Sequence, residues 1–327
     1  MPVFPDHILT ILKAQKSLAV ALSGGPDSMA LAHALQALGL KTKLHLLTVD
    51  HGLRTESADE AKRVGEWVRS WRGCTHHILR WQGQKAASRI QENARAARYA
   101  LMADYCAGQG ISHLCLAHHQ DDQAETVLLR LAAGSGLDGL AGMRDMQVMD
   151  GLTLVRPFLS VPKSDLIAYC RMHDLSYVED PSNAVDKFAR VRLRHAREVL
   201  EREGLSSKRL SLSAQRLARG RDALEFYANQ VYNDTLQNKD TKRTVLKKSL
   251  LLQAPEDIVF RVLERVFFEL AGEGYFYGPR MERMENILHD LLRPGAFRKR
   301  TLGGAVISVD TKNDTVVFEK EIKPKRS

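Results

Sequence analysis

The sequence predicts an α/β protein with a doubly wound, mostly parallel sheet, followed by a helical linker and a smaller α+β C-terminal domain. Three observations support this class. Apolar, strand-like runs alternate with helical segments over about the first 170 residues. The first such run leads through a glycine turn directly into a helix, and a strongly basic stretch after residue 183 ends the alternation. Alternating strands and helices favour a parallel, Rossmann-like sheet that helices cover on both faces.

Each expected element follows from its own pattern of apolar residues. Strands are expected where short apolar runs lie between turn residues, at 18–22, 44–49, 75–81, 113–117 and 152–158. Helices are expected from apolar periodicity at 1–16, 29–38, 57–71, 86–108, 127–133 and 163–173, with a loop at 134–140. Because ligands bind beyond the carboxyl ends of parallel strands, polar clusters at those ends are site candidates.

The chain divides into three expected parts. Residues 1–205 form the sheet domain, 206–229 a basic helical linker, and 230–327 the C-terminal domain. In this last part, apolar periodicity predicts helices at 258–271 and 279–292. Alternating runs at 301–309 and 315–319 predict a hairpin.

Charge and cysteine content narrow the class of protein. The formal net charge of +9 favours a polyanionic partner without identifying it. The four cysteines contain no Cys-x-x-Cys pair, so neither a zinc knuckle nor a redox pair is indicated, and a reducing cytoplasm is expected. No signal peptide and no apolar run of membrane-spanning length is evident, so no membrane association is expected.

The turn after the first strand has the composition of an anion-binding site. Its residues are Ser23, Gly24, Gly25, Pro26, Asp27 and Ser28. Glycines let a phosphate approach the backbone, and the first amides of the following helix carry partial positive charge. The turn lacks the Gly-Lys-Ser/Thr ending of the common P-loop, which favours holding the pyrophosphate that leaves when the α-phosphate of ATP is attacked. The alternative is an ordinary glycine-rich turn.

A second cluster follows the strand at 113–117. His119, Asp122 and Glu125 are spaced so that neighbouring pairs lie close on a helix surface. Two carboxylates there can hold Mg²⁺ or orient an amine. His119 either orients a carboxylate or phosphate or has a structural role, and Asp121 is expected elsewhere on the helix, solvated. The alternative is a first helical turn whose acids only offset the helix dipole.

Together these motifs resemble the PP-loop ATP-pyrophosphatase superfamily and, within it, the tRNA(Ile)-lysidine synthase family. The resemblance covers most of the first 200 residues or so. The matching segments are Ser-Gly-Gly-Pro-Asp-Ser at 23–28, His-Gly-Leu-Arg at 51–54, Arg95 and Arg98 with Tyr99, 118–126, 134–140, Arg-Pro-Phe at 156–158 with Lys163, and Asp-Pro-Ser-Asn at 180–183 with Phe188 and Arg190.

That resemblance implies a two-step ligation. ATP adenylates the 2-oxo group of the wobble cytidine in a tRNA with a CAU anticodon, and the ε-amine of L-lysine then displaces AMP to form lysidine. ATP and Mg²⁺ are the implied cofactors, and tRNA and L-lysine the partners, with no obligate protein partner evident. Asp122, Glu125 and His119 become the catalytic candidates, with Asp122 and Glu125 either binding Mg²⁺ or steering the amine of lysine. Residues 230–327, which lie outside the clear resemblance, are expected to form a tRNA-binding domain.

Further candidates come from polar residues near the same strand ends. Asp50 and His51 are expected to contact the nucleoside, unless they only form a turn. Arg98, one helical step from Arg95, could bind a phosphate or lie in an ordinary surface pair. Arg190 and Arg194 are expected to contact tRNA or the active-site phosphates, unless their basic helix is simply solvated. The family usually has Asn where this chain has Val191, so the hydrogen bonds of that Asn must be made otherwise.

Two other functions remain open on this evidence. One is a different PP-loop enzyme, such as an amidating synthetase that uses ammonia; a tRNA thiolase would need cysteines in a suitable pair. The other is an ATP- or RNA-binding module without catalysis. The basic second half argues against a purely small-molecule substrate, and the acids near the phosphate turn argue against simple anion binding.

Overall fold

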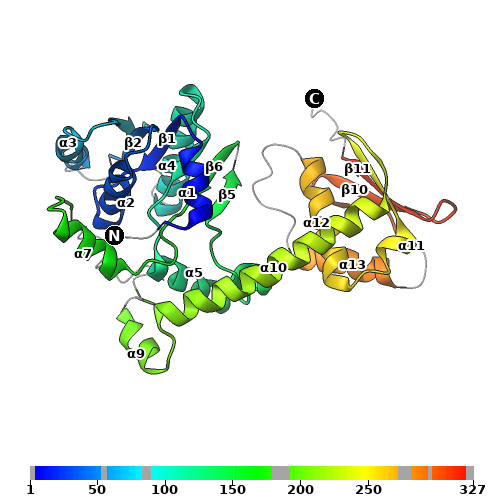
Figure 1. Cartoon of the computed structure of the whole chain (residues 1–327). Helices are drawn as coiled ribbons and strands as arrows, with labels where there is room; N and C mark the ends of the chain where they lie inside the picture. Colours follow the sequence, from blue (N-terminus) through cyan, green and yellow to red (C-terminus); the bar gives the residue numbers. More distant parts are fainter. Residues whose placement is uncertain are drawn as a thin grey trace. The chain divides into compact units, whose positions relative to one another are not determined.

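The computed structural model describes residues 4–52, 57–82, 90–149, 151–178, 192–193, 195–271, 281–293 and 297–321. It divides into two compact units, residues 1–218 and 219–327 (Figure 1). The long helix α10 (Ser207–Thr235) contains the boundary between them. No helix in these ranges is both long enough and apolar enough to cross a lipid bilayer.

The first unit is built on a six-stranded sheet in the order β3-β2-β1-β4-β6-β5. Five strands are parallel: β1 (Ser17–Ala21), β2 (Lys43–Asp50), β3 (Cys74–Arg80), β4 (His113–Cys115) and β6 (Leu152–Val155). The edge strand β5 (Met146–Met149), which the sequence did not predict, pairs antiparallel with β6. The predicted doubly wound, mostly parallel sheet is therefore confirmed.

Helices cover both faces of this sheet. One face packs against α1 (Asp6–Lys13), α2 (Pro26–Ala37), α3 (Ser57–Val68) and α7 (Lys163–Met172). The opposite face packs against α4 (Ile90–Gly108), whose Met102 and Cys106 are buried there. Successive residues of β1 alternate between the two cores, with Leu18 in the first and Ala19 in the second.

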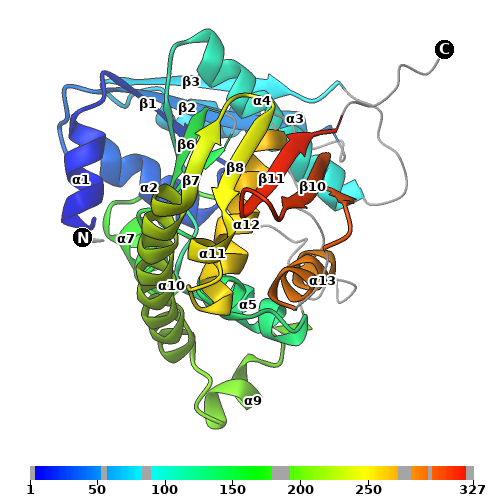
Figure 2. The ribbon, with the colours of Figure 1, turned by 90° about the vertical axis from the view of Figure 1, so that its right-hand side faces the viewer.

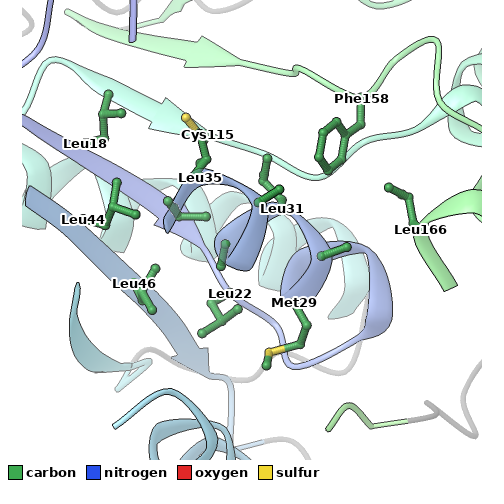
Figure 3. Close-up of a cluster of buried hydrophobic side chains, with 14 of the residues drawn as sticks. Leu18, Leu22, Met29, Leu31, Leu35, Leu44, Leu46, Cys115, Phe158 and Leu166 are labelled. Carbon is green, nitrogen blue, oxygen red and sulfur yellow. The ribbon is translucent and has the colours of Figure 1, made fainter. Parts of the chain in front are cut away.

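The central helix α2 is held by apolar contacts along most of its length. Met29, Leu31 and Leu35 are each about 1% exposed or less. Figure 3 shows them over Leu18 and Leu44 of the sheet. Burying each such side chain contributes roughly 1.5–3 kcal/mol. The position of α2, and with it the turn that precedes it, is therefore set by the core.

The topology switches direction beside β1. The chain runs from β1 outward to β2 and β3, then returns through α4 to β4 on the other side of β1. The carboxyl ends of β1 and β4 thus flank the switch point, where ligands of such sheets bind. Turn 23–28 follows β1, and α5 (Gln120–Ala132) follows β4. The expected loop at 134–140 contains a single helical turn, α6 (Leu137–Leu140).

The second unit combines an antiparallel sheet with helices, as the predicted α+β class requires. Its strand order is β7-β8-β11-β10-β9, with strands β7 (Leu236–Lys239), β8 (Arg243–Lys247), β9 (Arg300–Leu302), β10 (Ala305–Asp310) and β11 (Thr315–Lys320). Figure 2 shows this sheet beside α12 (Glu256–Ala271) and α13 (Met281–Leu292), and α11 (Lys248–Leu251) follows β8. One apolar core joins these elements, with Val262, Phe267 and Phe318 fully buried.

Candidate active site

The turn between β1 and α2 requires glycine at its second position. Gly24 has φ of +84°, a conformation that residues with side chains rarely adopt. A Cβ at Gly24 would also lie 2.5 Å from Cγ2 of Val64 in α3. The carbonyl of Gly24 accepts a hydrogen bond from Val178 N at 2.9 Å. The turn is therefore held close against α3.

The two serine hydroxyls of the turn bond to the turn itself. Ser28 Oγ donates to Gly25 O at 3.0 Å and accepts from Ser23 N at 3.1 Å. Ser23 Oγ lies 3.1 Å from Ser28 Oγ. Pro26 occupies the first turn of α2, and no side chain among the described residues caps this helix at Gly25. The first amides of α2 thus remain available for an anion.

His119 is the N-cap of α5. Its Nδ1 accepts hydrogen bonds from the backbone N–H groups of Asp121 at 3.2 Å and Asp122 at 3.4 Å. In return, Asp122 Oδ2 accepts from His119 N at 3.1 Å, which completes a capping box. Because Nδ1 must keep its lone pair for this cap, the proton of a neutral His119 lies on Nε2.

His119 brings the two predicted clusters together. Its Nε2 lies 3.6 Å from Asp27 Oδ2, in the turn, and 3.5 Å from Asp122 Oδ2 on its own helix. Lys163 Nζ, at the start of α7, lies 3.6 Å from the same oxygen of Asp27. Tertiary contact therefore joins three segments that are far apart in sequence.

The charges around His119 shift the pKa values of this cluster. Burial by itself lowers the pKa of His119, but the hydrogen bond that Asp27 accepts from it and the charges of Asp122, Asp27 and Asp121 raise it overall. Protonation would take the Nδ1 lone pair and break the helix cap, so the geometry opposes that rise. Burial raises the pKa of Asp27, and His119 and Lys163 outweigh this and lower it. Asp27 Oδ1 is buried and has no hydrogen-bond partner among the described residues.

A cavity of about 350 Å³ opens beside His119. Acids line it from α5, and apolar side chains from α5, α10 and the segment around α9 (Arg197–Arg202) complete the wall. The lining residues are His119, Asp121, Ala124, Glu125, Leu128, Lys163, Leu193, Arg197, Leu200, Glu201, Leu205, Ser207 and Leu210. Glu125, predicted to be catalytic, is only 8% exposed.

The expectation that Asp121 is solvated is wrong. Its side chain is 13% exposed, and its Oδ1 lies 3.5 Å from Arg197 Nη2. Arg197 also donates from Nε to Glu201 Oε1 at 2.8 Å. The reason is that Arg197 of α9 lines the same cavity as Asp121 and pairs with its carboxylate.

The second-strand candidates lie in a different arrangement. Asp50 Oδ1 accepts from the Ser57 hydroxyl at 2.7 Å and from Gly52 N at 2.9 Å, and the bond from Ser57 is the main reason that its pKa is lowered. Asp50 therefore links the end of β2 to the first residue of α3. The ring of His51 is edge-on to Trp81 at 6.3 Å. Burial, with the nearby charge of Arg98, lowers the pKa of His51.

The predicted arginines are only partly described. Arg98 is exposed on α4, and its neighbour Arg95 lies 5.4 Å from the ring of Tyr99. Arg190 and Arg194 lie outside the described residues, as do the Asp-Pro-Ser-Asn element at 180–183, Phe188, Val191 and the end of the 51–54 motif.

Comparison with known proteins identifies the family. Residues 4–202 match the family model of the PP-loop domain. The chain is 42% identical over 300 residues to tRNA(Ile)-lysidine synthase of Methylobacterium nodulans (strain LMG 21967 / CNCM I-2342 / ORS 2060), covering 90% of this chain and 88% of that relative. The chain belongs to the tRNA(Ile)-lysidine synthase family. A second member, from Wolbachia pipientis wMel, is 35% identical over 92% of this chain and 70% of its own length.

Among solved structures, the U34-tRNA thiolase NcsA from Methanococcus maripaludis has a similar fold. The TM-score is 0.55 with 18% identity, over 64% of this chain and 74% of that chain. At this identity the likeness concerns the fold alone.

Two cationic side chains lie at the site of this lysidine synthase family member that the sequence did not predict as site residues. In the sequence, Lys163 belongs only to the family match, and Arg197 is one of several arginines in the basic stretch after residue 183. The structure places Lys163 beside Asp27 and Arg197 beside Asp121. The available sequence signal for Lys163 was its position directly after Pro162, at the start of a helix. Nothing local distinguished Arg197 from its basic neighbours.

The donor set of the site fits a magnesium ion that arrives with a nucleotide. The described residues contain no group of three or more side chains arranged as metal ligands. Mg²⁺ bound to a nucleotide needs only one or two carboxylates, because phosphates and water supply its other ligands. The buried, unpartnered Oδ1 of Asp27 is a suitable oxygen, and the carboxylate of Asp122 contacts the same histidine.

Proposed function

We propose that this protein ligates L-lysine to the wobble cytidine of an isoleucine tRNA with a CAU anticodon, converting ATP to AMP and pyrophosphate. The supporting observation is that a phosphate-binding turn and a charged cavity of amino-acid size meet at one residue. His119 lies 3.6 Å from Asp27 of the turn and also lines the cavity. An enzyme that activates one substrate with ATP and then attacks it with an amine needs such a junction.

In the first step, the 2-oxo oxygen of cytidine attacks the α-phosphorus of ATP. The bond from that phosphorus to the bridging oxygen of the β-phosphate breaks, and pyrophosphate leaves. The first amides of α2 and the close backbone at Gly24 would hold the leaving phosphates. The turn itself contains no cationic side chain. Lys163, which lies beside Asp27 of the turn, supplies the positive charge for the phosphates.

Asp27 and Asp122 are the residues we propose to hold Mg²⁺ on the phosphates, with Glu125 as the further carboxylate in reach of the cavity. When bound, the ion neutralises charge on the phosphate oxygens. His119 orients the two aspartates through Nε2 and anchors them to the start of α5 through Nδ1.

In the second step, the amine nitrogen of lysine bonds to C2 of the activated cytidine. The C2–O bond breaks, and AMP leaves with the former 2-oxo oxygen. The amine must give up a proton, and Glu125 is the candidate acceptor because it is nearly buried in the cavity wall. Leu128, Leu200 and Leu205 offer apolar contact to the aliphatic stem of lysine.

The tRNA would bind through basic residues of both units. Our candidates for phosphate contacts remain Arg98, Arg190 and Arg194. We propose that residues 230–327 form the tRNA-binding domain and that His51 contacts the nucleoside. The net charge of +9 supports a polyanionic substrate. We place the reaction in the cytoplasm, where the tRNA, ATP and free lysine occur together.

The cysteines do not favour the thiolase alternative. Burial raises the pKa of Cys74, Cys106 and Cys170 to about 11 and that of Cys115 to about 12. Sulfur transfer needs a thiolate, which these environments suppress.

Incorporation of labelled L-lysine into CAU-anticodon tRNA, with pyrophosphate release measured in parallel, tests the proposal. Incorporation should require ATP and Mg²⁺. Asp122→Asn keeps an oxygen that can cap α5 but removes the charge, so incorporation should fall at least about 100-fold. Asp104→Asn, an exposed acid of α4, should change it less than about twofold. Turnover of ammonia with a small acid, without label entering the tRNA, would support the amidating synthetase instead.

A further inference from the structure

The charged side chains near the cavity lie in a row, each next to the following one. Arg197 Nη2 lies 3.5 Å from Asp121 Oδ1, and Asp121 Oδ2 lies 4.0 Å from Nδ1 of His119. Nε2 of the same ring lies 3.6 Å from Asp27, which in turn lies 3.6 Å from Lys163. The two cations therefore occupy opposite ends of the row, with Lys163 at the phosphate turn and Arg197 at the α9 wall.

This order gives the cavity a polarity. The activated cytidine must lie at the phosphate turn, because its AMP group is formed from the ATP that the turn binds. An attacking amine must therefore point toward Asp27 and Lys163. At the turn end, Asp27 and Asp122 outnumber the one cation, Lys163, which favours an amine there. At the other end, Arg197 lies among Asp121, Glu201 and Glu125, a mixed set of charges that matches the adjacent carboxylate and ammonium of an amino-acid head.

The Arg197 end is suited to the head of an amino acid. Arg197 has five N–H donors in a planar fork, and the contacts to Asp121 and Glu201 use Nη2 and Nε. The guanidinium can bind a carboxylate while Asp121 or Glu201 binds the α-ammonium beside it. An α-amine that is held as an ammonium between carboxylates has no free electron pair and cannot attack.

We infer that Arg197 is a specificity-determining residue that binds the α-carboxylate of lysine and so selects the ε-amine as the nucleophile. The inference rests on the proposed function and deepens it. It explains how one cavity distinguishes two amines of similar chemistry, since the bound head group leaves only the ε-amine at the reaction end. The ε-amine nitrogen forms the bond to C2, its proton passes to a carboxylate, and AMP leaves as above.

The test compares L-lysine with 1,5-diaminopentane, which has the same chain and amine but no carboxylate. If Arg197 binds the carboxylate, the unaltered enzyme should prefer lysine by at least about 30-fold in kcat/KM, the scale of one charge-assisted interaction. In Arg197→Met this preference should shrink to about threefold or less. Arg197→Lys should recover part of it, because an ammonium keeps the charge and loses the fork.

The linkage in the product gives a second readout that a structural role would not change. Digestion of the tRNA and mass spectrometry against α- and ε-linked standards should show ε-linked nucleoside only for the unaltered enzyme and a measurable α-linked fraction for Arg197→Met. Arg202→Met is the matched control, since Arg202 is an exposed arginine of the same helix that does not line the cavity. It should leave both preference and linkage unchanged.

The possible failures are distinguishable. If no enzyme form incorporates lysine, the proposed function is wrong. If lysine is incorporated but Arg197→Met lowers the use of lysine and diaminopentane equally, with only ε-linked product, the inference about Arg197 is wrong and the proposed function stands. Because the preference is a ratio within one variant, partial unfolding of that variant cancels from it.

Discussion

At the scale of single residues, the imidazole ring of His119 has two roles: it caps α5 and it contacts the carboxylates of the site. Nδ1 accepts two backbone N–H groups and starts α5, while Nε2 faces the carboxylates of Asp27 and Asp122. The side chain is only 3% exposed. A polar ring so deeply buried needs partners at both nitrogens, and here each nitrogen has them.

Two substitutions separate these tasks. Asn at position 119 can cap the helix through its amide oxygen but has no group at the place of Nε2, whereas Ala can do neither. We expect His119→Asn to keep the unfolding free energy within about 0.5 kcal/mol and His119→Ala to lower it by about 1 kcal/mol. Lysine incorporation should fall at least about 100-fold in both variants. Urea unfolding and labelled-lysine assays measure the two effects, and near-normal incorporation by His119→Asn would show that Nε2 does not serve the reaction.

At the scale of elements, the unit that organises the site is strand β1, turn 23–28 and helix α2. The strand and the helix are anchored by the apolar core around Leu18 and Leu31 (Figure 3). The turn is held instead by its own serine hydrogen bonds, by Val178, and by close contact with α3 at Val64. Glycine at position 24 is thus the local requirement for the conformation of this turn, and for the phosphate binding that we propose there.

A pair of glycine substitutions tests this requirement. Gly39, just after α2, also has a positive φ (+60°), but a Cβ there would meet nothing within 4 Å. Gly39→Ala should therefore cost about 1 kcal/mol of stability from backbone strain alone and leave the KM for ATP unchanged. Gly24→Ala adds a clash with Val64 and should cost at least about 2 kcal/mol and raise the KM for ATP tenfold or more.

Thermal unfolding and ATP titration of both variants measure these effects. Adding Val64→Ala to Gly24→Ala should recover part of the stability, because it removes the clashing methyl groups but not the backbone strain. Equal effects of the two glycine substitutions on ATP binding would contradict the role given to the turn.

At the scale of the whole molecule, the histidines make the two units respond differently to acid. Burial is the main cause that lowers the pKa of six of them: His33, His45, His51, His76, His77 and His113. All six belong to the first unit. They stay neutral in the folded state at pH values where the unfolded chain is already protonated.

Stability of the first unit should therefore fall as the pH drops below about 6.5 and through the lower folded pKa values. Each extra proton bound by the unfolded chain lowers the unfolding free energy by up to about 1.4 kcal/mol per pH unit. The carboxylates around His119 raise its pKa and act in the opposite direction, but protonation of this ring also breaks the cap of α5, and it is one group against six. Asp27, whose pKa is lowered, loses its contribution only below its ordinary value of 3.8.

The chain supplies its own probe for this prediction. Its three tryptophans, Trp67, Trp71 and Trp81, all lie in the first unit. Urea unfolding followed by tryptophan fluorescence should show a lower midpoint at pH 5.5 than at pH 7.5. Far-UV circular dichroism, which reports both units, should show that the remaining transition does not move. A fluorescence midpoint independent of pH would contradict the assignment of neutral, buried histidines.

Much of the fold could be predicted from local sequence. The parallel strands, the turn at 23–28 and the start of α5 follow from apolar runs, glycines and acids within a few residues of one another. The strands β5, β7 and β8 escaped prediction. β5 carries two exposed residues of four and β7 carries three, whereas β8 has three buried residues but is only five residues long. Their pairing depends on neighbouring strands, which local periodicity does not encode.

The sequence by itself determined the family, the sheet, the glycine turn at 23–28 and the acidic helix. Each of these features depends on residues that are close together in the chain, so local patterns are enough to predict it. Only the tertiary structure decided that His119 contacts Asp27, that Lys163 stands beside the phosphate turn, and that Arg197 pairs with Asp121 in the cavity wall. Those partners are separated by between 76 and 136 positions along the chain. Packing of whole helices on the sheet brings them together, and no short-range pattern records where such helices meet.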